Sequence, residues 1–178
     1  MKGFSVKSVV AVGIGAAIFV VLTKISIPSP IANTTIQITY GFLTLMSFIF
    51  GPIVGFLIGL IGHALGDMIN WGSIWWSWVF ASAAFGLLAG ILGKMVGINS
   101  FSKRIVLFVI GAVVVNVVVW GGIAPGLDVL IYAEPMDKVF AQGLMAGLIN
   151  AVSTVVIGGL LIFGYSKTMV KEGSLSKD

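Results

Sequence analysis

Long apolar stretches constrain this chain more than any other feature of its sequence. Stretches such as residues 105–120 and 139–165 consist mainly of Val, Ile, Leu, Ala, Phe and Gly, and a helix needs about 20 such residues to cross ~30 Å of hydrocarbon. The whole chain is 58% hydrophobic and only 9% charged, which is more apolar surface than a soluble domain of 178 residues can bury. The glycines scattered through these stretches favour helix packing in lipid over strand alternation. We therefore predict an all-α, polytopic membrane protein.

Six membrane helices are predicted, and they form a single domain. Their approximate ranges are 8–27, 36–50, 52–68, 74–92, 105–120 and 139–165, followed by a polar tail over 166–178. The second helix is short, because its fifteen residues reach only about 22 Å. Pro28 and Pro30 end the first helix, so the polar loop over 28–37 either dips into the bundle as a lid or connects two helices at the surface.

The basic residues predict which way the bundle faces. With six crossings both termini lie on one side, and eight basic residues fall there against only Lys24 and Lys138 on the other side. The eight are Lys2, Lys7, Lys94, Lys103, Arg104, Lys167, Lys171 and Lys177. Because cytoplasmic loops of membrane proteins are enriched in Lys and Arg, both termini are predicted to be cytoplasmic. The loops over 28–37, 70–76 and 121–138 then face outward.

The run GHALGDMINWGSIWWSW, residues 62–78, holds the only histidine and four of the five tryptophans. His63, Asp67 and Asn70 follow at i, i+4 and i+7, so they share one side of a helix end. Tryptophans can form an anchoring belt at a membrane interface, but a belt would be distributed over both interfaces. Ionisable groups in a membrane helix usually face a wet interior. The run is therefore predicted to form one wall of a binding site.

Other polar and aromatic residues are predicted at the same outer end. Aromatic faces can sandwich a flat heterocycle, and amide, imidazole and carboxylate groups can orient it through hydrogen bonds. The candidate substrate-binding residues are Asn33, Gln37, Tyr40, His63, Asp67, Asn70, Trp71, Trp75, Trp76, Asn116, Trp120, Gln142 and Asn150. The sequence thus predicts an outward-facing pocket for a flat, polar ligand.

Catalytic chemistry finds little support in the sequence. The chain lacks cysteine, its single histidine has no evident nucleophile as partner, and residues 86–94 lack the spacing of a phosphate-binding loop. One imidazole and scattered carboxylates make a poor transition-metal site. We predict that the chain is not an enzyme, has no catalytic residue, and binds no metal, cofactor or nucleic acid.

Two pairs of small residues lie four positions apart in the first predicted helix. They are Ala11 with Gly15 and Gly13 with Ala17. Such pairs let another helix backbone approach closely, and that helix could belong to the same chain or to a separate membrane subunit. The spacing by itself favours the same chain.

The helix layout and the run over 62–78 resemble the substrate-binding S component of energy-coupling factor (ECF) vitamin transporters, in particular the hydroxymethylpyrimidine/riboflavin-type branch. The resemblance covers nearly the whole chain and implies a multi-pass protein of the bacterial plasma membrane. It implies uptake of a vitamin or vitamin precursor together with a membrane scaffold, the T component, and two ATP-binding subunits that use ATP. It also implies that the first helix docks on the T component through Ala11, Gly13, Gly15 and Ala17.

The substrate implied by the resemblance is hydroxymethylpyrimidine, the thiamine precursor, or riboflavin. The hydrogen-bonding groups around one small aromatic cage favour the pyrimidine. Family members that handle cobalt or nickel begin with Met-His, whereas Lys2 follows Met1 here, so a metal substrate is disfavoured. A rival hypothesis is a channel-forming or structural membrane protein in which the tryptophans serve only as an anchor.

Overall fold

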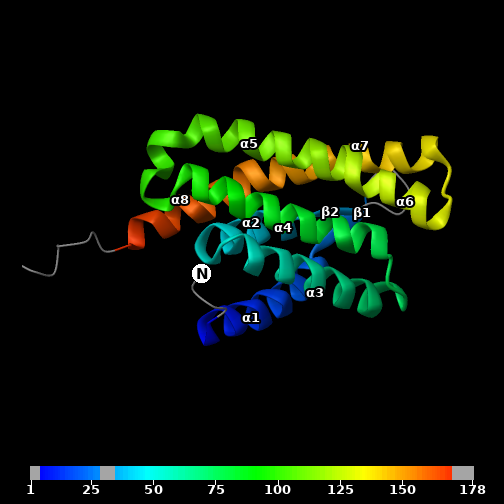
Figure 1. Ribbon diagram of the computed structural model, residues 1–178, viewed down its shortest axis with the longest axis horizontal. Coiled ribbons are helices and arrows are strands. Elements are labelled where there is room, and N and C mark those ends of the chain that lie inside the picture. The colour runs from blue at the N-terminus through cyan, green and yellow to red at the C-terminus, as the bar shows by residue number, and fades with distance from the viewer. Residues whose placement is uncertain (1–4, 29–34, 170–178) are drawn as a thin grey trace, which may run out of the picture.

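The computed structural model describes residues 5–28 and 35–169, which form an elongated bundle of helices along one axis (Figure 1). The α-helices are α1 Val6–Thr23, α2 Thr39–Phe50, α3 Pro52–Trp71, α4 Trp76–Val96, α5 Ile105–Val118, α6 Ala124–Tyr132, α7 Met136–Val152 and α8 Gly159–Thr168. The shorter elements are strands β1 Ser26–Pro28 and β2 Thr35–Gln37, the 3₁₀ helix η1 Ile98–Arg104, and the π-helical turns η2 Val119–Ile123 and η3 Ser153–Gly158.

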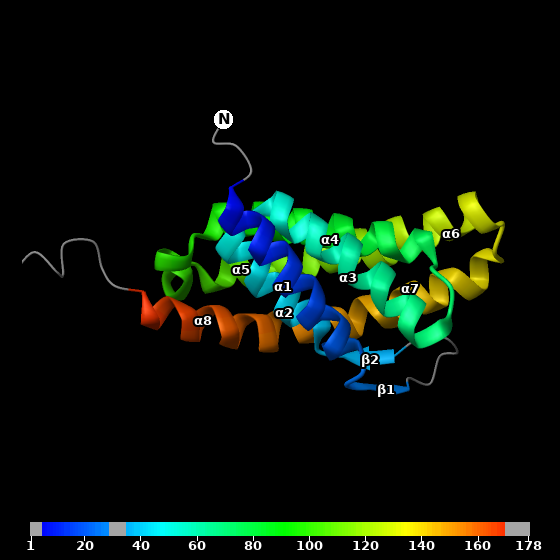
Figure 2. The same ribbon diagram turned by 90° about the horizontal axis from the view of Figure 1, so that it is seen from below.

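Five helical segments of the described chain are long and apolar enough to cross a membrane. They cover Val6–Thr23, Pro52–Trp71, Trp76–Val96, Ile98–Tyr132 and Met136–Thr168. These spans confirm the predicted helical membrane bundle, to which the structure adds two strands of three residues. α2 has only 12 residues, so the total of six crossings and the cytoplasmic side of the termini stay predictions. The start of α1 and the end of α8 lie toward the same end of the bundle (Figure 2).

The largest correction concerns residues 121–138, which were predicted to form a long loop. Instead, α5 continues through the π turn η2 into α6, and the helical path ends only at Tyr132. Glycines and Pro125 suggested a break in this stretch, but proline is tolerated in the first turn of a helix, where its missing N–H is not needed. Pro125 occupies such a position in α6. Asp128 consequently lies on a helix, at the end of the bundle.

Several predicted helix boundaries also move. α1 ends at Thr23 rather than at residue 27, because the chain turns there into an antiparallel hairpin of β1 and β2. α3 continues to Trp71 rather than residue 68, and Gly72 ends it with a φ of 75°, a left-handed conformation that glycine adopts without strain. The remaining shifts are the starts of α2, α4 and α7, predicted at 36, 74 and 139, and the ends of α4 and α8, predicted at 92 and 165.

α3 and α4 pack closely through glycine, as the sequence predicted. A Cβ atom added at Gly59 would collide with the carbonyl oxygen of Ser82, and one added at Gly55 would collide with that of Gly86. Only glycine permits backbones to approach in this way. The contact places Ser82 beside Gly59 of α3. His63 follows one helical turn later and is hydrogen-bonded to Ser82.

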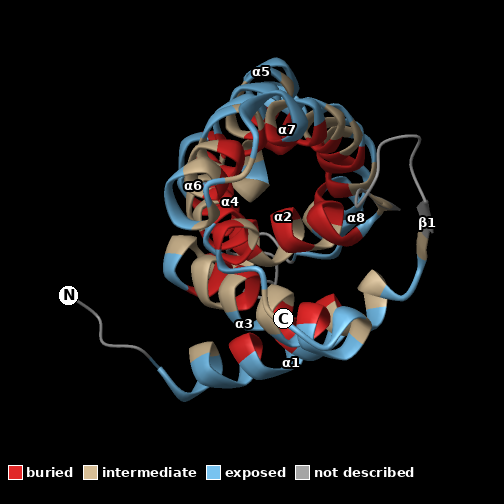
Figure 3. Cartoon of the chain, turned by 90° about the vertical axis from the view of Figure 1, so that its right-hand side faces the viewer, coloured by how far each residue is buried: buried red, intermediate tan, exposed pale blue. Residues whose placement is uncertain are grey.

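Burial separates an apolar outer surface from a packed interior (Figure 3). Large apolar side chains such as Val10, Val106 and Leu160 are exposed on the outside, as a lipid-facing surface requires. α4 contributes much of the interior, where Val79 and Phe85 are completely buried. The cavity described next lies within this interior, at one end.

Candidate substrate-binding site

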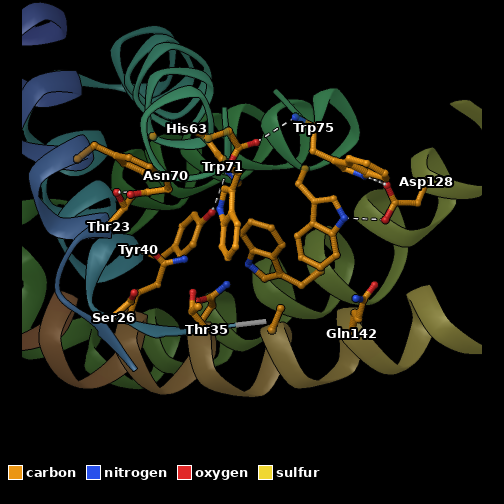
Figure 4. Close-up of a pocket in the computed structure, with 18 of the residues that line it drawn as sticks. Thr23, Ser26, Thr35, Tyr40, His63, Asn70, Trp71, Trp75, Asp128 and Gln142 are labelled. Carbon is orange, nitrogen blue, oxygen red and sulfur yellow. Dashed lines mark hydrogen bonds and ion pairs between the residues drawn. The ribbon is translucent and has the colours of Figure 1, made fainter. Parts of the chain in front are cut away.

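A cavity of about 650 Å³ lies where the β hairpin, the end of α3 and the first part of α7 meet (Figure 4). This is the end of the bundle away from the start of α1 and the end of α8 (Figure 2). Of the thirteen predicted residues, those that line it are Gln37, Tyr40, His63, Asp67, Asn70, Trp71, Trp75, Trp120, Gln142 and Asn150. The structure therefore brings together side chains from α2, α3, α7, η2 and the β hairpin, although their contact with a substrate stays a prediction.

Two predicted residues do not line the cavity, and a third lies outside the described residues. Trp76 has a 44% exposed side chain that packs beside Phe80. Asn116 is fully buried between α5 and η3, where its amide donates to the carbonyl oxygen of Ala112 at 2.8 Å and to Thr154 Oγ1 at 3.2 Å. Asn33 lies outside the described residues.

A hydrogen-bonded chain of side chains forms the polar wall on α2, α3 and α4. Tyr40 Oη lies 2.7 Å from Ser82 Oγ, which is also hydrogen-bonded to His63 Nδ1. The other ring nitrogen, His63 Nε2, lies 3.3 Å from Asp67 Oδ1. Every group is satisfied when Tyr40 donates to Ser82, Ser82 donates to Nδ1, and Nε2–H donates to Asp67. The arrangement holds the imidazole in one orientation at the cavity.

Asp67 and Asn70 also position the neighbouring backbone and helix. Asp67 Oδ2 accepts a hydrogen bond of 3.1 Å from the backbone N–H of Trp75, the residue that precedes α4. Asn70 Nδ2 donates to Thr23 Oγ1 at 3.0 Å, which joins the end of α3 to the end of α1. Asp67 and Asn70 thus hold neighbouring elements in place and also line the cavity.

Aromatic rings form another part of the wall. Trp120 stacks on Trp78 with ring centroids 5.8 Å apart, and it meets Tyr40 edge-on at 4.7 Å. Figure 4 shows Tyr40 and Trp71 directed into the same space. Trp120 Nε1 is buried and has no hydrogen-bond partner among the described residues. Its indole therefore brings an unpaired donor to the wall.

Asp128 is the main site residue that the sequence analysis missed. It is 2% exposed, and its carboxylate accepts hydrogen bonds of 2.6 Å from both Trp75 Nε1 and Trp78 Nε1, together with one from Ser77 Oγ. The carboxylate thereby fixes the orientation of two cavity-lining indoles (Figure 4). The residues before it gave no helix signal, because glycines and Pro125 are typical of a loop.

Charged residues form the rim. Lys138 Nζ lies 2.6 Å from Glu134 Oε2, with exposed side-chain fractions of 46% and 20%. Lys24, at the end of α1, also lines the cavity. Across the described parts of the chain, no three His, Cys, Asp or Glu side chains are grouped so that they could hold a metal ion.

Comparison with known proteins decides the family. The family described as the ECF-type riboflavin transporter, S component, matches residues 3–167. The chain belongs to this family. It is also 50% identical to a UPF0397 protein of Lactobacillus gasseri, an alignment covering 99% of this chain and 98% of the relative. UPF0397 proteins of Streptococcus pneumoniae and Streptococcus gordonii are each 49% identical over 98% of this chain, covering 98% and 96% of their own lengths.

Membership of the ECF S component family gives the chain a coarse role. It is a membrane transport subunit that works with a T component and ATPase subunits, and an S component is not itself an enzyme. The family match covers residues 3–167, so the role applies to almost the whole described bundle.

The two small-residue pairs of α1 in this S component face different surroundings. Ala11 and Gly15 are buried against the chain itself, and a Cβ atom at Gly15 would lie only 2.5 Å from Ile58 Cδ1. Gly13 and Ala17 are exposed, and a Cβ atom at Gly13 would have no neighbour within 4 Å. Ala11 and Gly15 are therefore not accessible to a partner, whereas Gly13 and Ala17 are.

Proposed function

We propose that this S component captures a vitamin or vitamin precursor at the outer face of the membrane and delivers it inward with a T component and two ATP-binding subunits. The observation that carries the proposal is the cavity of about 650 Å³, in which polar side chains from several helices lie among tryptophans. Pockets of roughly 300–1,000 Å³ with a few polar groups in an aromatic lining suit small organic ligands.

Hydroxymethylpyrimidine is the proposed substrate. Its single flat ring suits stacking on an indole, and its amino, hydroxyl and ring nitrogen groups can exchange hydrogen bonds with amides such as those of Gln37 and Asn150, which line the cavity. Riboflavin is the second candidate, and the description of the matched family favours it. Its larger ring system would need a longer aromatic wall, for which Trp71, Trp78 and Trp120 are available.

The proposed orientation places the cavity outside the cell and the start of α1 in the cytoplasm. Among the described residues, Lys24 and Lys138 are the basic side chains that line the cavity. The described basic residues of the opposite end are Lys7, Lys94, Lys103, Arg104 and Lys167. This asymmetry follows the enrichment of Lys and Arg in cytoplasmic loops.

The proposed docking surface for the T component is the exposed strip of α1 that includes Gly13 and Ala17. Small residues at a membrane helix surface let a second helix approach closely, which is a major source of affinity between helices in lipid. The strip lies on the outside of the bundle, while the other face of α1 contributes Phe19 and Thr23 to the cavity. One helix would thus contact both the partner and the ligand site.

Tryptophan fluorescence of the purified protein tests the ligand, because four tryptophans line the cavity. We expect a saturable change on titration with hydroxymethylpyrimidine and a weaker one or none with riboflavin. A larger change with riboflavin would make riboflavin the preferred substrate. No fluorescence change with either compound would reject both as substrates. Uptake of the bound compound into cells should require the ATP-binding subunits. Uptake without them would favour the channel hypothesis.

A further inference from the structure

Among the described residues, one carboxylate of the cavity has no partner that carries or can gain a positive charge. Three carboxylates line the cavity, those of Asp67, Asp128 and Glu134. Asp67 faces the imidazole of His63 and Glu134 pairs with Lys138. Within the described residues, the hydrogen bonds to Asp128 all come from neutral donors, namely two indoles and one hydroxyl. Its negative charge is stabilised by these bonds but not neutralised.

This uncompensated charge acts on the rings that a ligand would touch. Trp75 and Trp78 both line the cavity, and each donates its indole N–H to Asp128 at 2.6 Å. Hydrogen-bonded groups polarise one another in a site of low dielectric constant, so a carboxylate at the N–H increases the electron density of the indole ring. An electron-rich indole face attracts cations. The negative charge of Asp128 therefore makes the faces of the Trp75 and Trp78 indoles more attractive to a cation.

The remaining charges do not offset this effect. Five charged side chains line the cavity, of which three are carboxylates and two are lysines. Lys138 is held by Glu134 at the rim, and Lys24 is exposed at the end of α1. The cavity thus has a net charge of −1 when the imidazole is neutral.

We propose that the cavity selects a nitrogen heterocycle that carries a positive charge. The inference rests on the proposed function, because it assumes that this cavity is the site of capture, and it narrows the substrate class. A cationic ring would stack on the Trp75 and Trp78 indoles and would compensate the charge of Asp128. An aminopyrimidine belongs to this class when its ring nitrogen binds a proton, whereas the ring system of riboflavin is neutral.

A matched set of compounds tests the selectivity on the unmodified protein. The cation is 1-methylnicotinamide, a pyridinium. Nicotinamide is its uncharged counterpart, and N-methyl-2-pyridone-5-carboxamide carries the methyl group without the charge. Tryptophan fluorescence and calorimetry of the purified full-length chain measure their affinities. We expect the cation to bind about tenfold more tightly than either neutral compound.

The variant Asp128→Asn tests which residue creates the preference. The amide keeps the shape of the side chain and removes the charge, so the affinity ratio between cation and neutral compounds should fall toward one. Asp137→Asn is the matched control, because Asp137 is an exposed carboxylate in the first turn of α7 at the same end of the bundle and does not line the cavity. The control should keep the full ratio.

Equal affinities for the three compounds, or tighter binding of the neutral ones, would overturn the inference, as would an unchanged ratio in Asp128→Asn. The affinities measured on the unmodified protein test the inference even if Asp128→Asn does not fold. Failure of the inference can be distinguished from failure of the proposed function by uptake assays. ATP-dependent uptake of riboflavin without a preference for cations would overturn the charge selectivity and leave the transport role intact.

Discussion

The two ends of the bundle are built from the same helices but are filled in different ways. At the end that holds η1, phenylalanine rings pack directly on one another, with Phe108 meeting Phe48 at 5.7 Å and Phe101 at 5.0 Å between ring centroids. Leu92 and Ile162 complete this buried cluster. At the cavity end, tyrosine and tryptophan rings join Phe19 in lining the cavity, and polar side chains lie among them.

The difference follows from the chemistry of the rings. A phenylalanine has no polar atom, so its rings can fill a space completely without hydrogen bonds. A buried tyrosine hydroxyl or indole N–H needs an acceptor, and here Ser82 and Asp128 provide it. The rings of Tyr40, Trp75 and Trp78 therefore each bring a polar neighbour to this end, where the cavity lies. One end is closed by packing and the other can receive a ligand.

Ala17→Trp is expected to have the largest effect, and that effect should be confined to binding of the T component. A bulky ring at this exposed position should abolish co-purification with a T component, while ligand binding at the other end stays unchanged. Val114→Trp is the control, because Val114 is 54% exposed on α5, across the bundle from α1 (Figures 1 and 3), and it should leave the complex intact. A complex that survives Ala17→Trp would place the docking surface elsewhere.

Loss of a ring from the closed end should affect stability without affecting the site. Phe108 is completely buried, so Phe108→Ala should reduce the free energy of unfolding by about 3–5 kcal/mol. Thermal unfolding in detergent, followed by circular dichroism, measures the loss. Val106→Ala, at a 68% exposed position, should change stability by only about 0.5 kcal/mol. Weaker ligand affinity in folded Phe108→Ala would contradict the separation of the two ends.

Adjacent tryptophans at the cavity end should behave differently. Trp75 lines the cavity and bonds to Asp128, whereas Trp76 does not line it. Trp75→Ala should weaken ligand binding by about 1–3 kcal/mol, the range of a buried hydrogen bond and a ring contact. Trp76→Ala should bind like the unmodified protein in the same fluorescence or calorimetric titration. Equal losses would indicate that both rings act only as interfacial anchors.

The smallest effect is expected in the hydrogen-bonded wall. Ser82→Ala removes the group shared by Tyr40 and His63, but Tyr40 Oη lies 3.4 Å from His63 Nδ1 and can replace part of the interaction. We expect a loss of about 1 kcal/mol in the free energy of unfolding, measured by thermal unfolding. Ser100→Ala, in η1 at the closed end, is the control. A larger loss in the control would show that the wall contributes little to stability.

Much of this site could be predicted because its residues follow simple periodicities. His63, Asp67 and Asn70 share one helix side, and the tryptophans after them have no equivalent elsewhere in the sequence. The cavity end of the bundle was also indicated by the distribution of lysines. Asn116 was wrongly predicted to line the cavity, because the sequence pattern does not show which neighbour a buried amide faces. In the structure its amide donates to Thr154 on η3.

Asp128 could not be predicted for a different reason. Glycine and proline before it are typical of a loop, and a π turn is too irregular for its hydrogen bonds to be inferred from residue types. Its indole partners are also about fifty positions away in the chain, at Trp75 and Trp78. Such long-range pairing becomes visible only in the folded bundle.

The π turn η2 has one consequence for how this protein could be altered. A π turn corresponds to one residue inserted into an α-helix, and each residue rotates the following helix by roughly 100°. Deleting one residue between Val119 and Ile123 would restore a regular helix and rotate all of α6. Asp128 would turn away from Trp75 and Trp78. Loss of a single residue such as Gly121 or Gly122, neither of which lines the cavity, would therefore dismantle the aromatic wall.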